Sequence, residues 1–245
     1  MRHYLVVDDN LAFADNLAEI LRDAGAEVVT AAGGAHALRI AAVQKFDALI
    51  TDMRMPSMSG AALVHEILRV DPGLPAIVIT AYTGEDDLAA ARYEGLLAIL
   101  PKPAPITQLL DLLAAARRDG LVAVVDDDRA VSECMAEALR QRGFSAVMAH
   151  SVVEIDRLGS VRLFAALVDL RMPGGTDGEA LRRLKARFPL LPMLILTGHH
   201  QGPPSPLVFL KPFDTARVMG ALEAVYDSAE SQQRRAGLPR SGLRR

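Results

Sequence analysis

The chain has 245 residues, which fits one large domain or two small ones at roughly 100–200 residues per domain. Hydrophobic residues make up 51% of the sequence and charged residues 23%, enough to bury a core and keep a polar surface. The formal net charge of −3 gives no reason to expect a nucleic-acid partner, and the single cysteine excludes an intramolecular disulfide and fits a cytoplasmic location.

The chain opens Met-Arg-His-Tyr and then enters an apolar run that is too short for a signal peptide or a membrane span. Short apolar runs in the first half lie near Tyr4–Val7, Val28–Thr30, Ala48–Thr51, Ile77–Thr80 and Ala98–Leu100. They mostly lack polar alternation, which is typical of strands covered on both faces. Helical patterns separate them. We therefore expect an α/β fold with a doubly wound parallel sheet of flavodoxin-like order 2-1-3-4-5.

A helical pattern at Ile106–Arg118 closes the first half, and Asp119 and Gly120 alone separate it from the next apolar run. We expect a first domain at 1–118 and a second at 121–227. From residue 228 the composition changes to Ser, Gln, Gly and Arg, which predicts a disordered basic tail at 228–245.

The two halves are similar to each other in sequence. Leu-Val-Val-Asp-Asp at 5–9 recurs as Ala-Val-Val-Asp-Asp at 123–127. The segment ending Asp-Met-Arg-Met-Pro at 52–56 recurs as Asp-Leu-Arg-Met-Pro at 169–173. A repeat of this length indicates two tandem copies of one domain.

The second copy is shorter than the first between a threonine and a lysine. Thr80 and Lys102 are 22 residues apart, whereas Thr197 and Lys211 are 14 apart. The shorter stretch contains three prolines and two glycines, and an interior proline costs a helix roughly 3 kcal/mol. We therefore expect the second copy to lack its fourth helix, while Gly84–Leu97 in the first copy has helical composition.

Polar side chains follow the expected strands at their carboxyl ends. In the first half these are Asp8, Asp9, Asp52, Thr80 and Lys102. The carboxyl ends of parallel strands meet at one edge, where such sheets bind ligands. Three carboxylates in one small site repel each other, and Mg²⁺ removes that conflict. A lysine and a threonine hydroxyl can hold phosphate oxygens, beside a carboxylate that acts as nucleophile.

The pattern Asp-Asp, Asp-x-Arg-Met-Pro, Thr-Ala or Thr-Gly, and Lys-Pro occurs in this order in both halves. It resembles the receiver domain of bacterial two-component response regulators. The resemblance implies phosphoacceptors at Asp52 and Asp169. It implies one Mg²⁺ in each half. In the first half Asp9, the phosphoacceptor and the backbone carbonyl of Arg54 hold the ion directly, and Asp8 holds it through water. In the second half the same roles fall to Asp127, the phosphoacceptor, the backbone carbonyl of Arg171 and Asp126. It also implies switch hydroxyls at Thr80 and Thr197 and phosphate-binding lysines at Lys102 and Lys211.

The sequence departs from the family's usual pattern at the aromatic switch position. Receivers often have an aromatic residue three positions before the lysine, and here those positions hold Ile99 and Val208. Phe209 comes one residue later and should point to the other face of its strand. The family's coupling of the threonine to a swinging aromatic ring therefore lacks its usual residue in both halves.

The resemblance implies phosphorelay signalling, with phosphoryl transfer from a histidine kinase or phosphotransferase and no substrate turnover. No helix-turn-helix or cyclase sequence accompanies the two halves, so we expect output by contact with a downstream protein. In this family helix 4, strand 5 and helix 5 commonly carry dimerisation. Because the first half alone is expected to keep that surface, any homodimer should form through it.

Two alternatives stay open. One is a receiver-like interaction module in which one half does not respond to phosphorylation. The other is an aspartate-nucleophile phosphatase, although that class usually places a second acid two residues after the nucleophile, where this chain has Arg54 and Arg171. A flavin site is less favoured because no phosphate-cradling loop follows the first strand.

Overall fold

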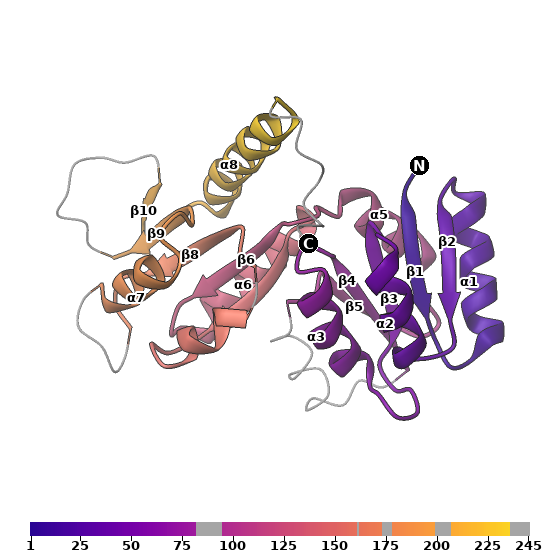
Figure 1. The fold of residues 1–245 in the computed structure, drawn as a ribbon. Helices are drawn as coiled ribbons and strands as arrows, with labels where there is room; N and C mark the ends of the chain where they lie inside the picture. The colour runs from indigo at the N-terminus through magenta and orange to yellow at the C-terminus, as the bar shows by residue number, and fades with distance from the viewer. Residues whose placement is uncertain (82–94, 161, 173–177, 199–206, 236–245) are drawn as a thin grey trace. The chain divides into compact units, whose positions relative to one another are not determined.

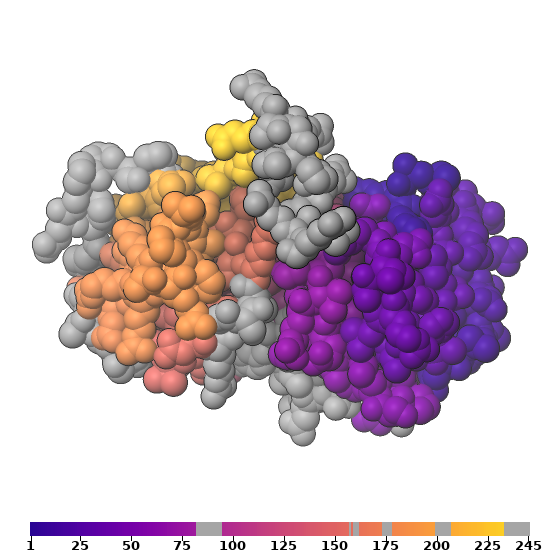
Figure 2. Space-filling view, in the orientation of Figure 1, coloured from indigo at the N-terminus to yellow at the C-terminus, as the bar shows by residue number. Residues whose placement is uncertain are grey.

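The computed structural model describes residues 1–81, 95–160, 162–172, 178–198 and 207–235. The chain divides into two compact units, Met1–Asp119 with Gly143–Ser145, and Gly120–Arg142 with Ala146–Arg245 (Figure 1). Figure 2 shows the surface of each unit in space-filling form, in the colours of the ribbon. Among the described residues, no helix combines the length and the hydropathy needed to cross a membrane.

The first unit contains a five-stranded parallel sheet of order β2-β1-β3-β4-β5, which confirms the expected topology. Its strands are β1 (His3–Val7), β2 (Glu27–Ala31), β3 (Ala48–Asp52), β4 (Ala76–Thr80) and β5 (Ala98–Pro101). Every residue of the central strands β3 and β4 is buried. Their unbroken apolar sequences are those of strands covered on both faces.

Helices cover both faces of this sheet (Figure 1). Two of them, α1 (Leu11–Asp23) and α5 (Ile106–Ala115), contribute to one apolar core. The other two, α2 (Gly34–Val43) and α3 (Gly60–Val70), contribute to the second core. The amphipathic patterns of the sequence thus become two layers around one sheet.

Helix α5 ends at Ala115, three residues before the expected end at Arg118. Arg118 instead places one guanidinium nitrogen 2.8 and 2.9 Å from the two carboxylate oxygens of Asp71, and it also donates to the carbonyl of Phe46. Asp119 then adopts a left-handed backbone with φ of 55°. These contacts turn the chain away from the helix axis.

The second unit contains a five-stranded sheet of order β10-β9-β8-β6-β7, the same topology as the first. Its strands are β6 (Leu121–Val125), β7 (Ser145–Ala149), β8 (Ala165–Asp169), β9 (Met193–Thr197) and β10 (Val208–Leu210). Its α-helices among the described residues are α6 (Arg129–Gln141), α7 (Glu179–Arg187) and α8 (Thr215–Arg235). The repeat seen in the sequence therefore corresponds to two sheets of one topology.

The segment after β7 forms a 3₁₀ helix, η1 (Glu154–Ser160), at the place where α2 stands in the first unit. The sequence of α2 contains four alanines in ten residues, whereas the segment around η1 contains no alanine and includes Val152, Val153 and Gly159. Residues of these types lower helix propensity, which accounts for the shorter and tighter element.

Residues 228–235 belong to the last turns of α8, so the expectation that they are disordered was wrong. The sequence there is poor in apolar residues but rich in alanine, glutamate, glutamine and arginine, all good helix formers. Residues 236–245 lie outside the described part of the chain.

The expected loss of the fourth helix falls on residues 199–206, and the helical segment expected at Gly84–Leu97 falls mostly on 82–94. Both segments lie outside the described residues.

Candidate phosphoryl and metal sites

The carboxyl end of the first sheet brings Asp8, Asp52 and Lys102 together. Lys102 Nζ lies 2.7 Å from Asp8 Oδ2 and 2.6 Å from Asp52 Oδ1. Both carboxylates are buried, with 2% of Asp8 and 7% of Asp52 exposed, whereas Asp9 is exposed. The lysine therefore forms ion pairs with two buried acids that are 44 residues apart in the sequence.

Main-chain amides orient the same two acids. The amide of Arg54 donates to Asp52 Oδ2 at 2.6 Å, and the amide of Asn10 donates to Asp8 Oδ1 at 2.9 Å. Thr80 is buried at the end of β4, and its carbonyl accepts from the amide of Lys102 at 2.8 Å. The expected switch threonine is thus linked through the main chain to the expected phosphate-binding lysine.

The second sheet repeats this arrangement with its own residues. Lys211 Nζ lies 2.7 Å from Asp126 Oδ2 and 2.8 Å from Asp169 Oδ2. The amide of Arg171 donates to Asp169 Oδ1 at 3.1 Å, and the carbonyl of the buried Thr197 accepts from the amide of Lys211 at 2.8 Å. The sequence repeat therefore preserves the geometry of the site as well as its residues.

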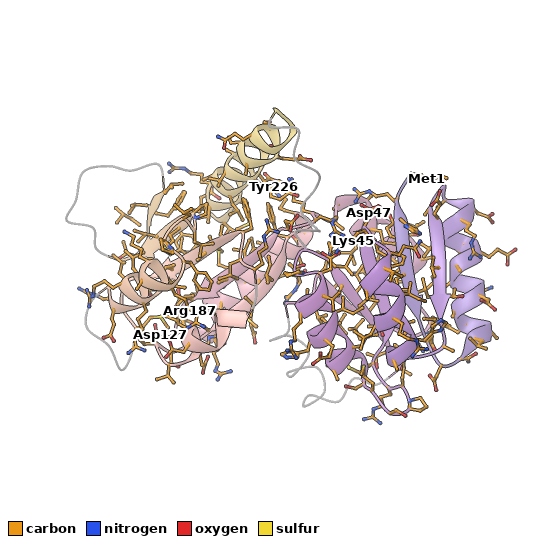
Figure 3. The ribbon with its side chains drawn as sticks, in the orientation of Figure 1. Met1, Lys45, Asp47, Asp127, Arg187 and Tyr226 are labelled. Carbon is orange, nitrogen blue, oxygen red and sulfur yellow. The ribbon has the colours of Figure 1, made fainter. Side chains whose placement is uncertain are left out.

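The second site also brings three acids close enough to hold one ion. One carboxylate oxygen from each of Asp126, Asp127 and Asp169 lies within 4.8 Å of the others. Asp127 is the exposed member and is the second residue after β6 (Figure 3). Although they are also described, Asp8, Asp9 and Asp52 do not meet that limit. Oxygen ligands of this kind fit the coordination preferred by Mg²⁺.

Burial and ion pairing act in opposite directions on the lysines. Burial lowers the pKa of Lys102, but its hydrogen bonds to Asp52 and Asp8 outweigh that effect and leave the pKa above its ordinary value. The pKa of Lys211 is raised in the same way, by Asp126 and Asp169 against burial. Both lysines are therefore held as cations.

Burial has the largest effect on the pKa of Asp126. It raises the pKa of the Asp126 carboxyl above its ordinary value, and the hydrogen bond from Lys211 offsets this only in part. A buried carboxylate of this kind is a group that an added cation stabilises.

Two features of these sites were not anticipated from the sequence. The first is the ring of Phe13, whose centroid lies 4.5 Å from Lys102 Nζ, a cation–π contact. The second is the set of side chains behind Asp126, described below. The sequence contains a signal for the first feature. Asn10 is the N-cap residue of α1, so Phe13 lies in the first turn of that helix, close to the carboxyl end of β1.

The structure also describes Ile99 and Val208, which stand where receivers often have an aromatic residue. Ile99 is half-buried and packs against the core on the α2–α3 face. Val208 is half-buried, and Phe209 is buried with 8% exposed. Alternate residues of a strand face opposite sides, so Phe209 does not occupy the side that the family's aromatic residue uses.

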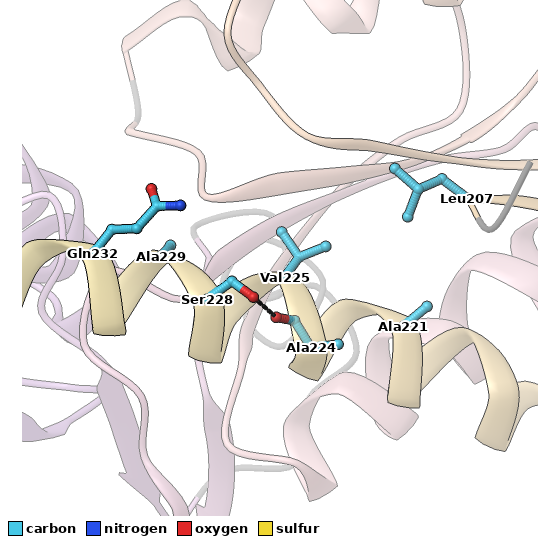
Figure 4. Close-up of a pocket in the computed structure, with 7 residues that line it drawn as sticks. All are labelled: Leu207, Ala221, Ala224, Val225, Ser228, Ala229 and Gln232. Atoms are coloured by element: carbon cyan, nitrogen blue, oxygen red, sulfur yellow. Dashed lines mark hydrogen bonds between the residues drawn. The ribbon is translucent and has the colours of Figure 1, made fainter.

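A separate cavity of about 480 Å³ lies against α8 (Figure 4). Its lining consists of Leu207, Ala221, Ala224, Val225, Ser228, Ala229 and Gln232. The Ser228 hydroxyl donates to the carbonyl of Ala224 at 2.7 Å. This lining contains no acid, base or cationic side chain, so it offers none of the chemistry found at the two acidic sites.

Comparison with known proteins identifies relatives of the chain. The response regulator receiver domain family matches residues 4–114. A response regulator receiver protein of Anaeromyxobacter sp. (strain Fw109-5) is 61% identical over 228 residues, which are 92% of this chain and 96% of that protein. The transcriptional regulatory protein GlrR of Escherichia coli (strain K12) is 41% identical over 101 residues, covering 41% of this chain but 23% of GlrR.

One solved structure among those similar to this chain is the receiver domain of a Pseudomonas aeruginosa sensor histidine kinase with magnesium in its active-site cleft. It is 29% identical, with a TM-score of 0.42, and the match covers 46% of this chain and 93% of that one. The Anaeromyxobacter relative, in contrast, is similar over nearly the full length of both proteins. The chain therefore belongs to the response regulator receiver family.

Proposed function

We propose that this chain is a tandem receiver that accepts a phosphoryl group on Asp52 and a second on Asp169. The donor is a histidine kinase or a histidine phosphotransferase. Support comes from one observation above all: in both units a single lysine Nζ lies within 2.8 Å of two buried carboxylates. One of the two acids ends the third strand of its sheet.

The chemistry follows from these contacts. A carboxylate oxygen of Asp52 attacks phosphorus, an oxygen–phosphorus bond forms, and the phosphorus–nitrogen bond of the donor phosphohistidine breaks, so that the imidazole leaves. Lys102 then exchanges its contact with Asp52 for one with a phosphoryl oxygen. When bound, Mg²⁺ supplies charge neutralisation for the incoming phosphoryl oxygens. Asp9 and the carbonyl of Arg54 are the expected ligands in the first unit.

In the second unit the corresponding roles fall to Asp169, Lys211, Asp127 and the carbonyl of Arg171. The acids at this site are already grouped within 4.8 Å, which supports its capacity to hold Mg²⁺. No substrate is turned over beyond slow loss of the protein's own phosphoryl group. Output then depends on contact with a downstream protein.

Intact-mass measurement after incubation with acetyl phosphate and Mg²⁺ tests this proposal. The natural chain should gain up to two phosphoryl groups. Asp52→Asn and Asp169→Asn should each gain one at most, and the double variant none. Chelation of Mg²⁺ by EDTA should prevent labelling of all four proteins.

Other outcomes would contradict the proposal. Two phosphoryl groups on Asp52→Asn would show that the acceptor in the first unit is another residue. One phosphoryl group on the natural chain and one on Asp169→Asn would leave the second unit as an interaction module. Rapid release of phosphate, with turnover of the donor, would indicate a phosphatase.

A further inference from the structure

A polar network lies behind Asp126 in the second unit. The hydroxyl of Ser132, which is fully buried in α6, donates to the main-chain carbonyl of Asp126 at 3.0 Å. His150 directly follows β7, and its Nδ1 lies 3.0 Å from the same oxygen. Because that partner is an acceptor, the contact assigns the proton to Nδ1. The main-chain amide of His150 in turn donates to Glu154 Oε2 at 2.8 Å.

The equivalent positions in the first unit carry no polar side chain. Ser132 is the fourth residue of α6, and the fourth residue of α1 is Ala14. The amide of Asp126 donates to the last residue of β7, and the amide of Asp8 donates to the last residue of β2, each at 3.2 Å. The residue after β2 is Ala32, so alanine stands where the second unit has Ser132 and His150.

Two donors on one carbonyl oxygen use both of its lone pairs. The carbonyl of Asp126 belongs to the peptide group that joins Asp126 to Asp127, so its plane is held from two sides. The side chains of Asp126 and Asp127 branch from the two Cα atoms of that peptide group. The three acids whose oxygens lie within 4.8 Å of one another include both Asp126 and Asp127. The first unit, which has alanine in place of Ser132 and His150, has no equivalent group of acids among its described residues.

We infer that Ser132 and His150 are positioning residues that hold Asp126 and Asp127 in a cation-binding arrangement, so that the second site binds Mg²⁺ more tightly than the first before any phosphorylation. This inference rests on the proposed Mg²⁺ site of the second unit. Partners of metal ligands commonly act in this way, and their loss typically weakens metal binding by roughly 10–100-fold.

Site-resolved titration with Mg²⁺ tests the inference in the intact chain. The backbone amides of Arg54 and Arg171 contact the two phosphoacceptors, so their NMR chemical shifts report the two sites separately. In the natural chain the Arg171 signal should saturate at a Mg²⁺ concentration several-fold lower than the Arg54 signal. The double variant Ser132→Ala/His150→Ala reproduces the alanines of the first unit and should weaken the second site roughly tenfold or more, with the first site unchanged.

Conservative variants separate positioning from general stability. His150→Asn places an amide donor near Nδ1, and Ser132→Thr keeps the hydroxyl, so both should retain most of the affinity. His150 is half-buried, so His150→Ala alone is a second test if the double variant does not fold.

Three results would overturn the inference. Unchanged Mg²⁺ affinity of the second site in folded His150→Ala and Ser132→Ala would leave both residues without a positioning role while the proposed site stands. Equal weakening at Arg54 and Arg171 would point to a global effect of the substitutions. Absence of any Mg²⁺ response at Arg171 in the natural chain would remove both the inference and the proposed second site.

Discussion

At the scale of single residues, the first site depends on the small size of Gly60, the first residue of α3. Its amide donates to the carbonyl of Met53 at 2.8 Å, directly behind the end of β3. A Cβ at this position would lie 2.2 Å from the carbonyl oxygen of Asp52 and 3.1 Å from Met53 Cα. Both atoms belong to the main chain and cannot rotate away, so the approach of α3 to β3 requires glycine.

Gly60→Ala should therefore destabilise the first unit by about 1–3 kcal/mol, the usual range for an added group in a packed region. It should also slow labelling of Asp52, because the end of β3 must move. Chemical denaturation and intact-mass kinetics measure the two effects. Gly220→Ala in α8 is the control, since a Cβ there meets nothing within 4 Å and should be neutral or slightly stabilising. Equal stability of the two variants would contradict this account.

The raised pKa of Asp126 carries a consequence for stability. A group with a folded-state pKa above its unfolded value contributes stability that is fully present below the unfolded pKa and is lost as pH rises through the folded pKa. At neutral pH the ionised carboxylate therefore opposes folding when no cation is bound.

Asp126→Asn should raise the melting temperature at pH 7 in the absence of Mg²⁺, because it removes this charge while Lys211 keeps Asp169 at 2.8 Å. The advantage should shrink as pH falls toward 4. Thermal unfolding at several pH values measures it, with the exposed Asp127→Asn as the control. A lower melting temperature for Asp126→Asn at pH 7 would show that the ion pair with Lys211 outweighs burial.

At the scale of secondary-structure elements, an ion-pair cluster joins the end of the first unit to the segments that precede its central strands β3 and β4. Arg118 contacts both oxygens of Asp71 beyond α3 and the carbonyl of Phe46 before β3. Lys45, labelled in Figure 3, lies 3.2 Å from the same carboxylate. Only 5% of the Asp71 side chain is exposed, so its charge depends on these partners.

Arg118→Met should destabilise the first unit by about 2–4 kcal/mol, near the cost of breaking a buried pair but eased by Lys45. The matched control is Arg69→Ala, which breaks an exposed pair with Glu66 at 3.4 Å and should cost less than about 1 kcal/mol. Urea denaturation of the full chain measures both. If the two variants lost equal stability, the cluster would be an ordinary surface feature.

At the scale of the whole molecule, two similar sites differ in their surroundings. The resemblance to receivers places self-association on helix 4, strand 5 and helix 5, and the second copy is eight residues shorter within that region. We predict that activation-dependent dimerisation of the full chain runs through the first unit. Light scattering with beryllofluoride and Mg²⁺ should show mass doubling for the natural chain and Asp169→Asn but not for Asp52→Asn. The reverse pattern would place the interface in the second unit.

Much of the fold can be predicted from local patterns of apolar and polar residues in the sequence. Residues such as Ile77, Val78 and Ile79 form an unbroken apolar run, and that run is a central strand with every residue buried. The prediction of disorder at 228–235 is wrong because it rests on composition alone. A helix whose first turns pack through Val218, Met219 and Leu222 extends through such residues without further apolar contacts, because elongation costs less than nucleation.

The positions of Asp8, Asp52 and Lys102 after the apolar runs are enough to predict that they share one end of a sheet, because parallel strands bring their carboxyl ends to a common edge. The repeat predicts the same for Asp126, Asp169 and Lys211. The contacts among these groups depend on how the strands and helices pack. Gly60 behind Asp52, and Ser132 and His150 behind Asp126, act through contacts between different secondary-structure elements and the turns that follow them. Such contacts depend on the distance between packed elements, which periodicity and composition do not specify.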